Sequence, residues 1–303
     1  MRILANDGIS NTAKNKLENL GYTVDTNHYK GDDLIEQIKK VDCIIVRSAT
    51  KVRKALIDEA LKTKVLKLII RAGVGIDNID HIYAKELGLT VRNTPNSSSD
   101  AVAELAIGHM FSLARNIFIS NVTMREGKWL KKEYAGFELS GKILGLVGFG
   151  RISRSVAKKA IALGMTVIYD DLLGESDTFK ECVYVGKEKL LAEADIISLH
   201  IPFIKENGAY LNKTAFESMK KGMVIINTAR GGTVDETALL EGLDNGTVKC
   251  AALDVFESEP TLNEKIYTHP KISLTPHIGA ATKEAQDRIG DETIAVILEE
   301  LPQ

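Results

Sequence analysis

The chain has 303 residues, of which 44% are hydrophobic and 26% charged, and its formal net charge is −2. That length can hold two domains of ordinary size, and the composition is that of a globular protein. A balance so near neutrality gives no general attraction to nucleic acid or to anionic membranes, so we expect neither as a partner.

Cysteine usage and the N-terminus predict a cytoplasmic protein with reduced thiols. The three cysteines, Cys43, Cys182 and Cys250, are odd in number, far apart and without C-x-x-C spacing. Disulfides and a zinc site are therefore not expected. Residues 1–7 reach an acidic side chain too early for a signal peptide, and no apolar run approaches 18 residues. No pair of histidines has metal-ligand spacing, so we expect no metal ion.

Strands and helices alternate in the first third of the chain. We expect strands at 2–5, 22–25, 43–46, 66–70 and 89–91, with helices at 12–20, 31–40 and 53–63. This alternation predicts βαβ units and a mainly parallel sheet. Loops at 47–48, 71–75 and 93–96 follow strands, and ligands of open α/β sheets bind at such carboxyl ends. These loops are candidate substrate contacts, although ordinary turn chemistry is the alternative for each residue.

A long helical pattern runs from Ala101 to about Arg125, after a polar cluster at 96–100 that is rich in N-cap residues. Its apolar residues cover much of the circumference, and a helix that is apolar all round is buried. One domain face cannot easily cover it, so we expect a homodimer in which a second subunit does. The alternative is a helix enclosed between two domains of one chain.

A glycine-rich turn follows the apolar run 143–147 and precedes a segment, 155–163, with helical spacing. Gly148 permits a tight turn, and Gly150 lets the backbone approach a pyrophosphate. The helix start then offers N–H groups and its positive dipole end to the anion. Ser153 replaces the third glycine of the pattern. By itself, this motif is also compatible with a tight turn that binds nothing.

Asp170 decides in favour of a dinucleotide site. It ends the next predicted strand, 22 residues after Gly148, where a carboxylate binds the adenosine ribose of such cofactors. An aspartate there repels a 2′-phosphate, and no Arg or Lys lies within 171–177 to receive one. The predicted cofactor is therefore NAD.

A second alternating series occupies the rest of the chain. Its strands are expected at 143–147, 167–169, 196–199, 224–226, 250–253 and 272–275, followed by an amphipathic helix at 283–301 that packs back on the first domain. The predicted fold class is α/β, with two doubly wound parallel-sheet domains, the central one a Rossmann dinucleotide-binding domain. We expect residues 1–96 and 281–303 to form the substrate-binding domain and 97–280 the NAD-binding domain.

Three chemically distinctive residues follow the later strands. Arg230 can hold a carboxylate through its planar guanidinium, His277 can move a proton, and Glu259 can orient and charge that imidazole. A single histidine after a strand is often only a structural hydrogen-bonding group. That structural interpretation is the one adopted for the remaining histidines, His28, His81, His109, His200 and His269.

The segments 227–232, 253–260 and 275–282, together with the glycine loop, are similar to the NAD-dependent D-2-hydroxyacid dehydrogenase family. Within it, the stretches 45–52, 71–80, 125–129 and 282–286 resemble the D-3-phosphoglycerate dehydrogenases. Because the chain ends at Gln303, we expect a short form without the C-terminal regulatory domain of longer relatives, and no feedback inhibition by serine.

The resemblance implies roles for individual residues. Arg230 would bind the carboxylate and carbonyl oxygen of the substrate, and His277, paired with Glu259, would be the acid/base. The implied substrate contacts are Arg47, Ser48, Val74, Gly75, Asn96 and Arg230. The implied cofactor contacts are Val74, Gly148, Gly150, Arg151, Ile152, Asp170, Ile201, Thr228, Asp254, His277, Gly279 and Ala280.

Other functions stay open at this level. A reductase for glyoxylate, hydroxypyruvate or lactate would share the same catalytic residues, and an NAD-sensing corepressor that binds proteins would share the same fold. Arg47 is the expected ligand of a substrate phosphate. Lys131 and Lys132 could reach that phosphate from a neighbouring subunit, or simply form a solvated charged face.

Overall fold

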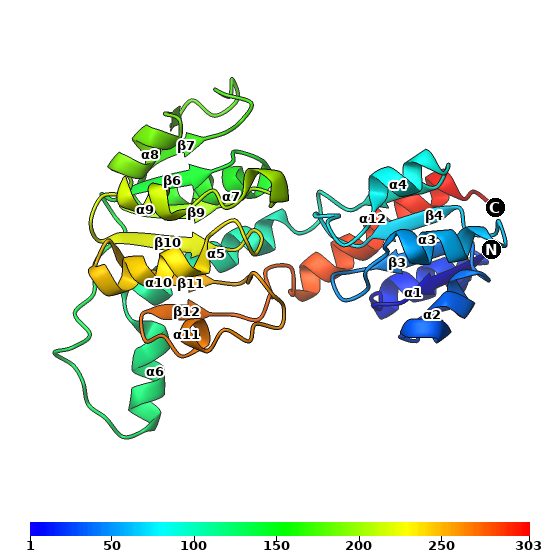
Figure 1. Ribbon diagram of the computed structural model, residues 1–303, viewed down its shortest axis with the longest axis horizontal. Helices are drawn as coiled ribbons and strands as arrows, with labels where there is room; N and C mark the ends of the chain where they lie inside the picture. Colours follow the sequence, from blue (N-terminus) through cyan, green and yellow to red (C-terminus); the bar gives the residue numbers. More distant parts are fainter. The chain divides into compact units, whose positions relative to one another are not determined.

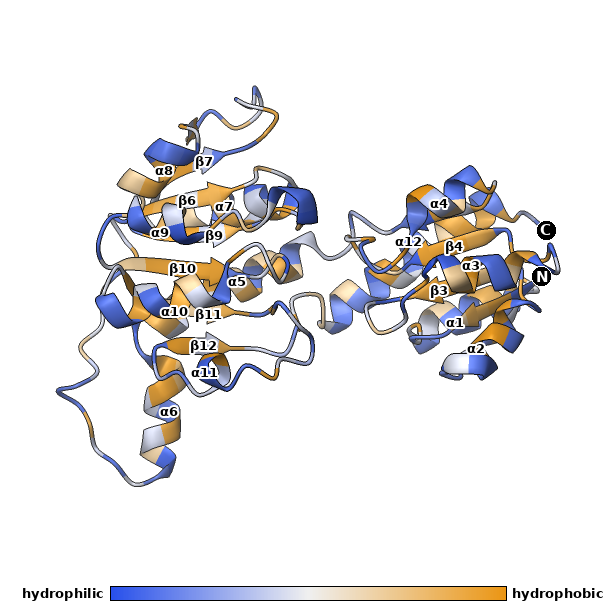
Figure 2. Cartoon of the chain, viewed as in Figure 1, coloured by the Kyte–Doolittle hydropathy of each residue, from blue (hydrophilic) through white to orange (hydrophobic).

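The computed structural model describes residues 1–303 and places a parallel sheet in each of two units (Figure 1). Unit 1 comprises Met1–Ser99 and Ala280–Gln303, and unit 2 comprises Asp100–Gly279. Both sheets are parallel throughout, which confirms the predicted α/β class. Figure 2 shows the strands of both sheets as the most hydrophobic segments, as expected for sheets covered on both faces.

Unit 1 has five strands in the order β2-β1-β3-β4-β5. They are β1 (Arg2–Ala5), β2 (Thr23–Asp25), β3 (Cys43–Val46), β4 (Leu68–Arg71) and β5 (Thr90–Asn93). The helices are α1 (Asn11–Asn19), α2 (Gly31–Ile38), α3 (Lys54–Leu61), α4 (His81–Glu86) and α12 (Lys283–Glu300). Every residue of β3 is buried, because side chains on both faces of the sheet lie under helices. The short helix α4 is absent from the sequence-based assignment.

The C-terminal helix α12 packs on the first domain, as predicted. Ile289, Ile297 and Leu301 join the core cluster that contains Ile3 and Leu68. The Tyr22 hydroxyl donates to the Leu301 carbonyl at 2.7 Å, which fixes the end of the helix. The chain therefore returns to its first domain after completing the second.

Unit 2 has seven strands in the order β12-β11-β10-β9-β6-β7-β8. They are β6 (Ile143–Val147), β7 (Thr166–Asp170), β8 (Cys182–Tyr184), β9 (Ile196–Leu199), β10 (Met223–Asn227), β11 (Val248–Leu253) and β12 (Ile272–Leu274). The strand order reverses between β6 and β9, and open α/β sheets bind ligands at such a point. The six-strand assignment missed β8, because only Cys182 of its three residues is buried.

Two helices precede the strands of unit 2, and the remaining helices lie between them. They are α5 (Ser99–Ala114), α6 (Ile117–Arg125), α7 (Arg151–Ala162), α8 (Lys187–Glu193), η1 (Lys205–Asn207), α9 (Lys213–Glu217), α10 (Glu236–Asn245) and α11 (Glu264–Tyr267). Two core clusters cover the two faces of the sheet. Along β7, Val167 and Tyr169 lie in one cluster and Ile168 in the other, as the two-residue period of a strand requires.

The prediction of one helix from Ala101 to Arg125 is wrong. The pattern breaks at Asn116, which has a left-handed backbone (φ 52°), and α5 and α6 meet at a 62° bend. Asparagine tolerates this conformation better than most residues, while the apolar spacing continues across it, so the break leaves no trace in the hydrophobic pattern. Met110 is fully buried inside unit 2, whereas Ile117 and Met124 are half exposed.

No single helix of the structure is long and apolar enough to cross a membrane. The bent pair of α5 and α6 meets that length and composition only when the two helices are taken together.

Candidate active site

The glycine loop between β6 and α7 leaves backbone groups open to a ligand. Gly148 has φ +80°, and a Cβ at this position would lie 2.6 Å from Cγ2 of Ile201, so only glycine fits. A Cβ at Gly150 would meet no atom within 4 Å, because this residue faces open space. No side chain caps α7, which begins at Arg151 and Ile152. Its first N–H groups and positive dipole end can therefore receive a phosphate.

Ser153 adds a contact that a third glycine could not make. Its side chain is fully buried, and its hydroxyl donates to the carbonyl of Gly148. The helix is thereby tied to the turn that precedes it. The substitution keeps the loop geometry, because a hydroxymethyl group is small enough for this close packing of helix and strand.

Asp170 ends β7 and Asp171 follows it, and the two carboxylates have different partners. One Asp170 oxygen accepts a 2.7 Å hydrogen bond from the Tyr210 hydroxyl. Burial, and secondly this bond to Asp170, raises the pKa of Tyr210, so the phenol stays a donor. Asp171 accepts from the N–H groups of Phe149 (2.5 Å) and Leu173 (2.8 Å) and so braces the glycine loop. Neither Tyr210 nor Asp171 was recognised in the sequence, although Asp171 stands beside the predicted ribose ligand.

Arg230 lies in the loop after β10, which Asn227 organises from within. The Asn227 amide donates to the Arg230 carbonyl and to the Thr233 hydroxyl, both at 3.1 Å, and its oxygen accepts from the Ala229 N–H. A Cβ on Gly231 would lie 1.7 Å from the carbonyl oxygen of Phe256, so this loop packs directly on the backbone of the next one. Asn227 begins the predicted motif 227–232, but the sequence alone does not indicate this role.

Glu259 and His277 are paired, as predicted. Nδ1 of His277 lies 2.7 Å from Oε2 of Glu259. Burial would raise the pKa of Glu259, but the hydrogen bond and charge of His277, with smaller contributions from the Phe256 N–H and the Arg230 charge, hold it below its usual value. The pair therefore keeps an ionised carboxylate on one imidazole nitrogen and leaves the other nitrogen for proton transfer.

The His277 loop is fixed by Asp254, which is almost fully buried. Its carboxylate accepts from the Thr275 hydroxyl (2.6 Å) and from the N–H groups of Ile278 (2.8 Å) and Gly279 (2.9 Å). These bonds hold the backbone around His277, whose φ of 52° lies in the left-handed region. Residues in such sparsely populated conformations concentrate at functional sites. The contact of Asp254 with the cofactor stays a prediction.

The predicted substrate residues of unit 1 lie in loops at the carboxyl ends of β3, β4 and β5. Arg47 and Ser48 follow β3, and the loop of Val74 and Gly75 follows β4. The Asn93 amide donates to the Val74 carbonyl at 2.6 Å and ties this loop to β5.

Two further predicted contacts are engaged within unit 1. Asn96 donates from its amide to Glu292 of α12 at 2.8 Å. Ala280, a predicted cofactor contact, begins the returning segment of unit 1, and its carbonyl accepts from Gln286 at 2.7 Å.

Comparison with known proteins decides the family. Residues 107–279 match the family described as "D-isomer specific 2-hydroxyacid dehydrogenase, NAD binding domain". The chain belongs to this family.

Relatives within this dehydrogenase family differ in substrate. The chain is 46% identical to a hydroxypyruvate reductase of Thermotoga maritima, over 99% of this chain and 98% of that protein. It is 41% identical to a D-3-phosphoglycerate dehydrogenase of Bacillus subtilis, but spans only 56% of that protein's length. Among solved structures, the D-lactate dehydrogenase of Aquifex aeolicus, complexed with NAD and lactic acid, is 29% identical with a TM-score of 0.84, over 99% of this chain and 97% of that one.

The NAD-binding domain of this dehydrogenase also contains unsatisfied polar atoms where a cofactor is expected. Thr228 Oγ1 and His200 Nδ1 are buried without a hydrogen-bond partner, at the carboxyl ends of the neighbouring strands β10 and β9. Together with the open Gly150 and the uncapped α7, they fit a dinucleotide. NAD, when bound, supplies the acceptor of a hydride.

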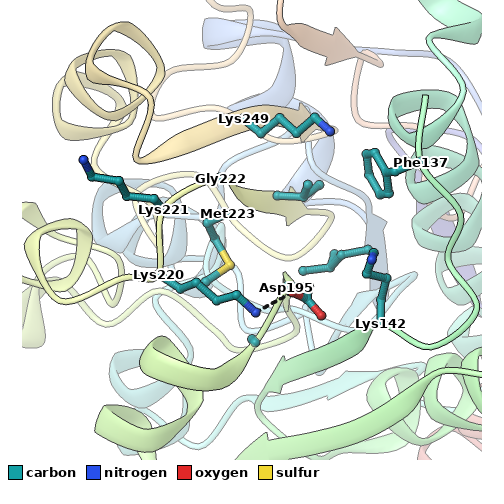
Figure 3. Close-up of a pocket in the computed structure, with 11 residues that line it drawn as sticks. Phe137, Lys142, Asp195, Lys220, Lys221, Gly222, Met223 and Lys249 are labelled. Carbon is teal, nitrogen blue, oxygen red and sulfur yellow. Dashed lines mark hydrogen bonds and ion pairs between the residues drawn. The ribbon is translucent and has the colours of Figure 1, made fainter. Parts of the chain in front are cut away.

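A further concavity lies elsewhere in this domain. It has a volume of about 180 Å³ and is lined by Phe137, Met223 and four lysines, Lys142, Lys220, Lys221 and Lys249, with Asp195 paired to Lys220 at 2.5 Å (Figure 3). These residues stand at the amino ends of the strands. Ligands of doubly wound sheets bind at the opposite edge, so this concavity is not part of the candidate active site.

Proposed function

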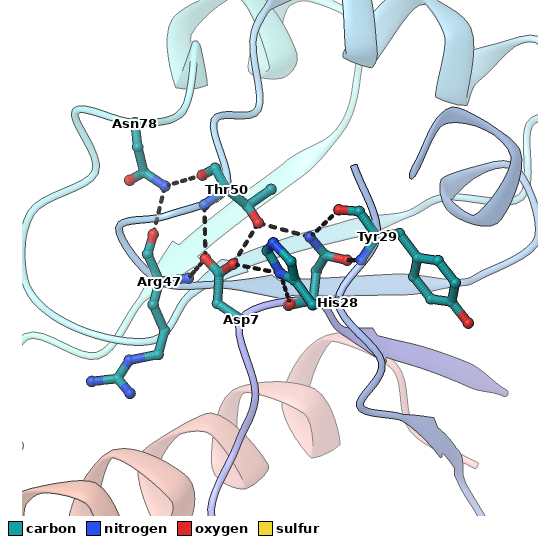
Figure 4. Close-up of polar contacts among 7 residues, drawn as sticks. Asp7, His28, Tyr29, Arg47, Thr50 and Asn78 are labelled. Atoms are coloured by element: carbon teal, nitrogen blue, oxygen red, sulfur yellow. Dashed lines mark hydrogen bonds and ion pairs between the residues drawn. The ribbon is translucent and has the colours of Figure 1, made fainter. Parts of the chain in front are cut away.

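We propose that this dehydrogenase oxidises D-3-phosphoglycerate with NAD to 3-phosphohydroxypyruvate, the first step of phosphorylated serine biosynthesis. The proposal is supported by the environment of the Arg47 guanidinium. No carboxylate pairs with its guanidinium, which points away from the polar network that holds its backbone (Figure 4). An unpaired guanidinium at the carboxyl end of β3 suits a phosphate group. A substrate without a phosphate does not need such a cation.

The residues of unit 2 supply the chemistry common to the family. Arg230 holds the substrate carboxylate in bidentate fashion. His277 takes the proton of the C2 hydroxyl while the C2 hydrogen leaves as hydride, so that the C–O bond becomes a carbonyl. Glu259 stabilises the imidazolium that forms. In the reverse direction His277 returns the proton to the carbonyl oxygen.

A second candidate is the reduction of hydroxypyruvate. It is supported by the 46% identity with the Thermotoga maritima reductase, since that protein and this chain match over nearly their full lengths. The two substrates differ by the phosphate on C3. Discrimination between the candidates therefore depends on the end of the substrate distant from its carboxylate.

NADH absorbance tests the proposal directly. We expect higher kcat/KM with 3-phosphohydroxypyruvate than with hydroxypyruvate, and with D-3-phosphoglycerate than with D-glycerate. Arg47→Ala should raise KM for the phosphorylated substrates by about tenfold or more, as expected for one charge-assisted contact, and leave the others nearly unchanged.

The matched control for Arg47→Ala is Arg53→Ala. Arg53 stands in the same loop but pairs with Asp80 at 2.9 Å, so its loss should alter no substrate preference. Equal losses on both kinds of substrate in Arg47→Ala, or a wild type that prefers hydroxypyruvate, would favour the reductase.

We also propose that the chain functions as a homodimer through α6 and the segment after it. Ile117, Met124 and Trp129 are 52%, 51% and 77% exposed, an unusual set of large apolar side chains on one short stretch. Lys131 and Lys132, also exposed, follow Trp129 and are candidate contacts for a phosphate bound by the partner.

A further inference from the structure

The loop between β3 and α3, residues 47–53, is held on one side by a buried carboxylate. Asp7, whose side chain is 4% exposed, accepts from the N–H groups of Arg47 (2.7 Å) and Thr50 (2.9 Å). Its other oxygen accepts from the Thr50 hydroxyl at 2.5 Å. One side chain from the end of β1 thus binds the two residues that bracket Ser48 (Figure 4).

An amide holds the same two residues from the other side. Nδ2 of Asn78 donates to the carbonyls of Arg47 (2.6 Å) and Thr50 (2.7 Å). A third side chain, Asn6, donates to the Thr50 hydroxyl at 2.8 Å. Residues 47 and 50 therefore have both backbone groups fixed by side chains that come from other segments of unit 1.

We propose that Asp7 and Asn78 are positioning residues that set substrate selectivity by fixing the backbone beneath the Arg47 guanidinium. The inference rests on the proposed function, in which Arg47 binds the substrate phosphate. A side chain on a fixed backbone has less conformational freedom to lose when it binds an anion. The network makes no polar contact to the guanidinium itself, so it positions the group without neutralising it.

Isosteric variants test the assignment. Asp7→Asn removes the negative charge and one of the two acceptor oxygens, so it cannot keep all three hydrogen bonds that Asp7 accepts. Asn78→Asp places a carboxylate oxygen against two carbonyls. Each should raise KM for D-3-phosphoglycerate about tenfold or more, change kcat by less than about twofold, and leave the affinity for NAD unchanged. Thr50→Val, a milder change, should also raise KM. Thr50→Ser should have the KM of the wild type, because serine keeps the hydroxyl.

The matched control is Asp42→Asn. Asp42 also accepts from a backbone N–H of unit 1, that of Arg2 at 2.8 Å, and contacts Lys67 at 3.2 Å, but it precedes β3 instead of following it. Its loss should leave KM unchanged. A rise in KM equal to that of Asp7→Asn would show a general loss of structure and overturn the assignment.

A double-mutant cycle separates action through Arg47 from independent action. If Asp7 works through Arg47, the variant with both Asp7→Asn and Arg47→Ala should have the same KM as Arg47→Ala alone. If the double variant instead has a higher KM than Arg47→Ala, by the factor that Asp7→Asn causes alone, the assignment is overturned.

Hydrogen exchange distinguishes a failure of this inference from a failure of the proposed function. In Asp7→Asn the amides of residues 47 and 50 should exchange faster while β3 stays protected. If the wild type prefers hydroxypyruvate, the proposed function fails, and the KM for hydroxypyruvate tests the positioning role instead. Faster exchange with no change in the KM of any substrate would overturn that role.

Discussion

At the scale of single residues, the site depends on polar side chains that hold its loops in place. Asp171, Asn227 and Asp254 form hydrogen bonds with the loops that carry the glycine turn, Arg230 and His277, respectively. Asn227 and Asp254 are buried, and buried polar groups are costly when left unpaired, so each of the two fixes a single loop conformation. The chemistry expected of Arg230 and His277 therefore depends on groups outside the reacting set.

The first residue-scale prediction concerns Tyr210. Tyr210→Phe removes the hydroxyl that holds one oxygen of Asp170. We expect the Kd for NAD to rise by about threefold to tenfold, with no gain for NADP, because the repelling charge of Asp170 remains. Asp170→Ala should weaken NAD and also narrow its advantage over NADP. Fluorescence titration with both cofactors measures these effects, and an unchanged Kd for NAD in Tyr210→Phe would remove Tyr210 from the cofactor site.

At the scale of elements, successive loops at the carboxyl end of the unit 2 sheet support one another. The loop after β10 lies against the backbone of the loop after β11 at Gly231. The same loops are joined by Glu236 and Glu257, each of which accepts from the backbone N–H of the other at 3.0 Å. A displacement of one loop is therefore transmitted to the next, which carries Glu259.

Substitution of Gly231 tests this coupling. Gly231→Ala would place a Cβ 1.7 Å from the Phe256 carbonyl oxygen, so the backbone must shift. We expect kcat/KM to fall about 10²-fold, the usual consequence of misplacing reacting groups by about 1 Å, while NAD still binds. Gly108→Ala is the matched control, since a Cβ at Gly108 meets nothing within 4 Å, and it should retain activity. Wild-type kcat/KM in Gly231→Ala would show that the loops are independent.

At the scale of the whole molecule, stability should depend on pH through buried histidines. Burial lowers the pKa of His200 to about 3 and also lowers that of His109. The unfolded chain binds these protons below about pH 6.5, whereas the folded chain binds them only at lower pH. The stability contributed by the neutral histidines is therefore complete above that pH and is lost as the pH falls towards 3.

Urea unfolding across this pH range checks whether the protein loses stability on acidification. The unfolding free energy of the wild type should fall on acidification, with a slope of at most about 1.4 kcal/mol per pH unit for each such histidine. His200→Gln should flatten the slope between pH 6.5 and 4, and its pH dependence between 7 and 9 should equal that of the wild type. An identical slope in both proteins below pH 6.5 would contradict the assignment.

The proposed dimer is the second prediction at this scale. Ile117 and Met124 are seven residues apart and so share one face of α6. Ile117→Glu with Met124→Glu should convert a dimeric wild type into a folded monomer in light scattering, because a charged face cannot be buried unpaired. Met110 is unsuitable for this test, since it is buried within unit 2 and its replacement by a charge would unfold the subunit. A monomeric wild type would refute the proposal.

The sequence by itself determined the parallel α/β class, the glycine loop with Asp170, and the Arg230, Glu259 and His277 motifs. These features are local: a two-residue or helical period, a glycine where φ is positive, a polar residue after an apolar strand. The break at Asn116 and the strand β8 left no such local mark. Only the tertiary structure showed that Asp7 and Asn78 hold residues 47 and 50, because those partners are 28 to 43 residues apart in the chain. The hydrogen bonds that position a loop are formed between distant segments, and no pattern of neighbouring residues records them.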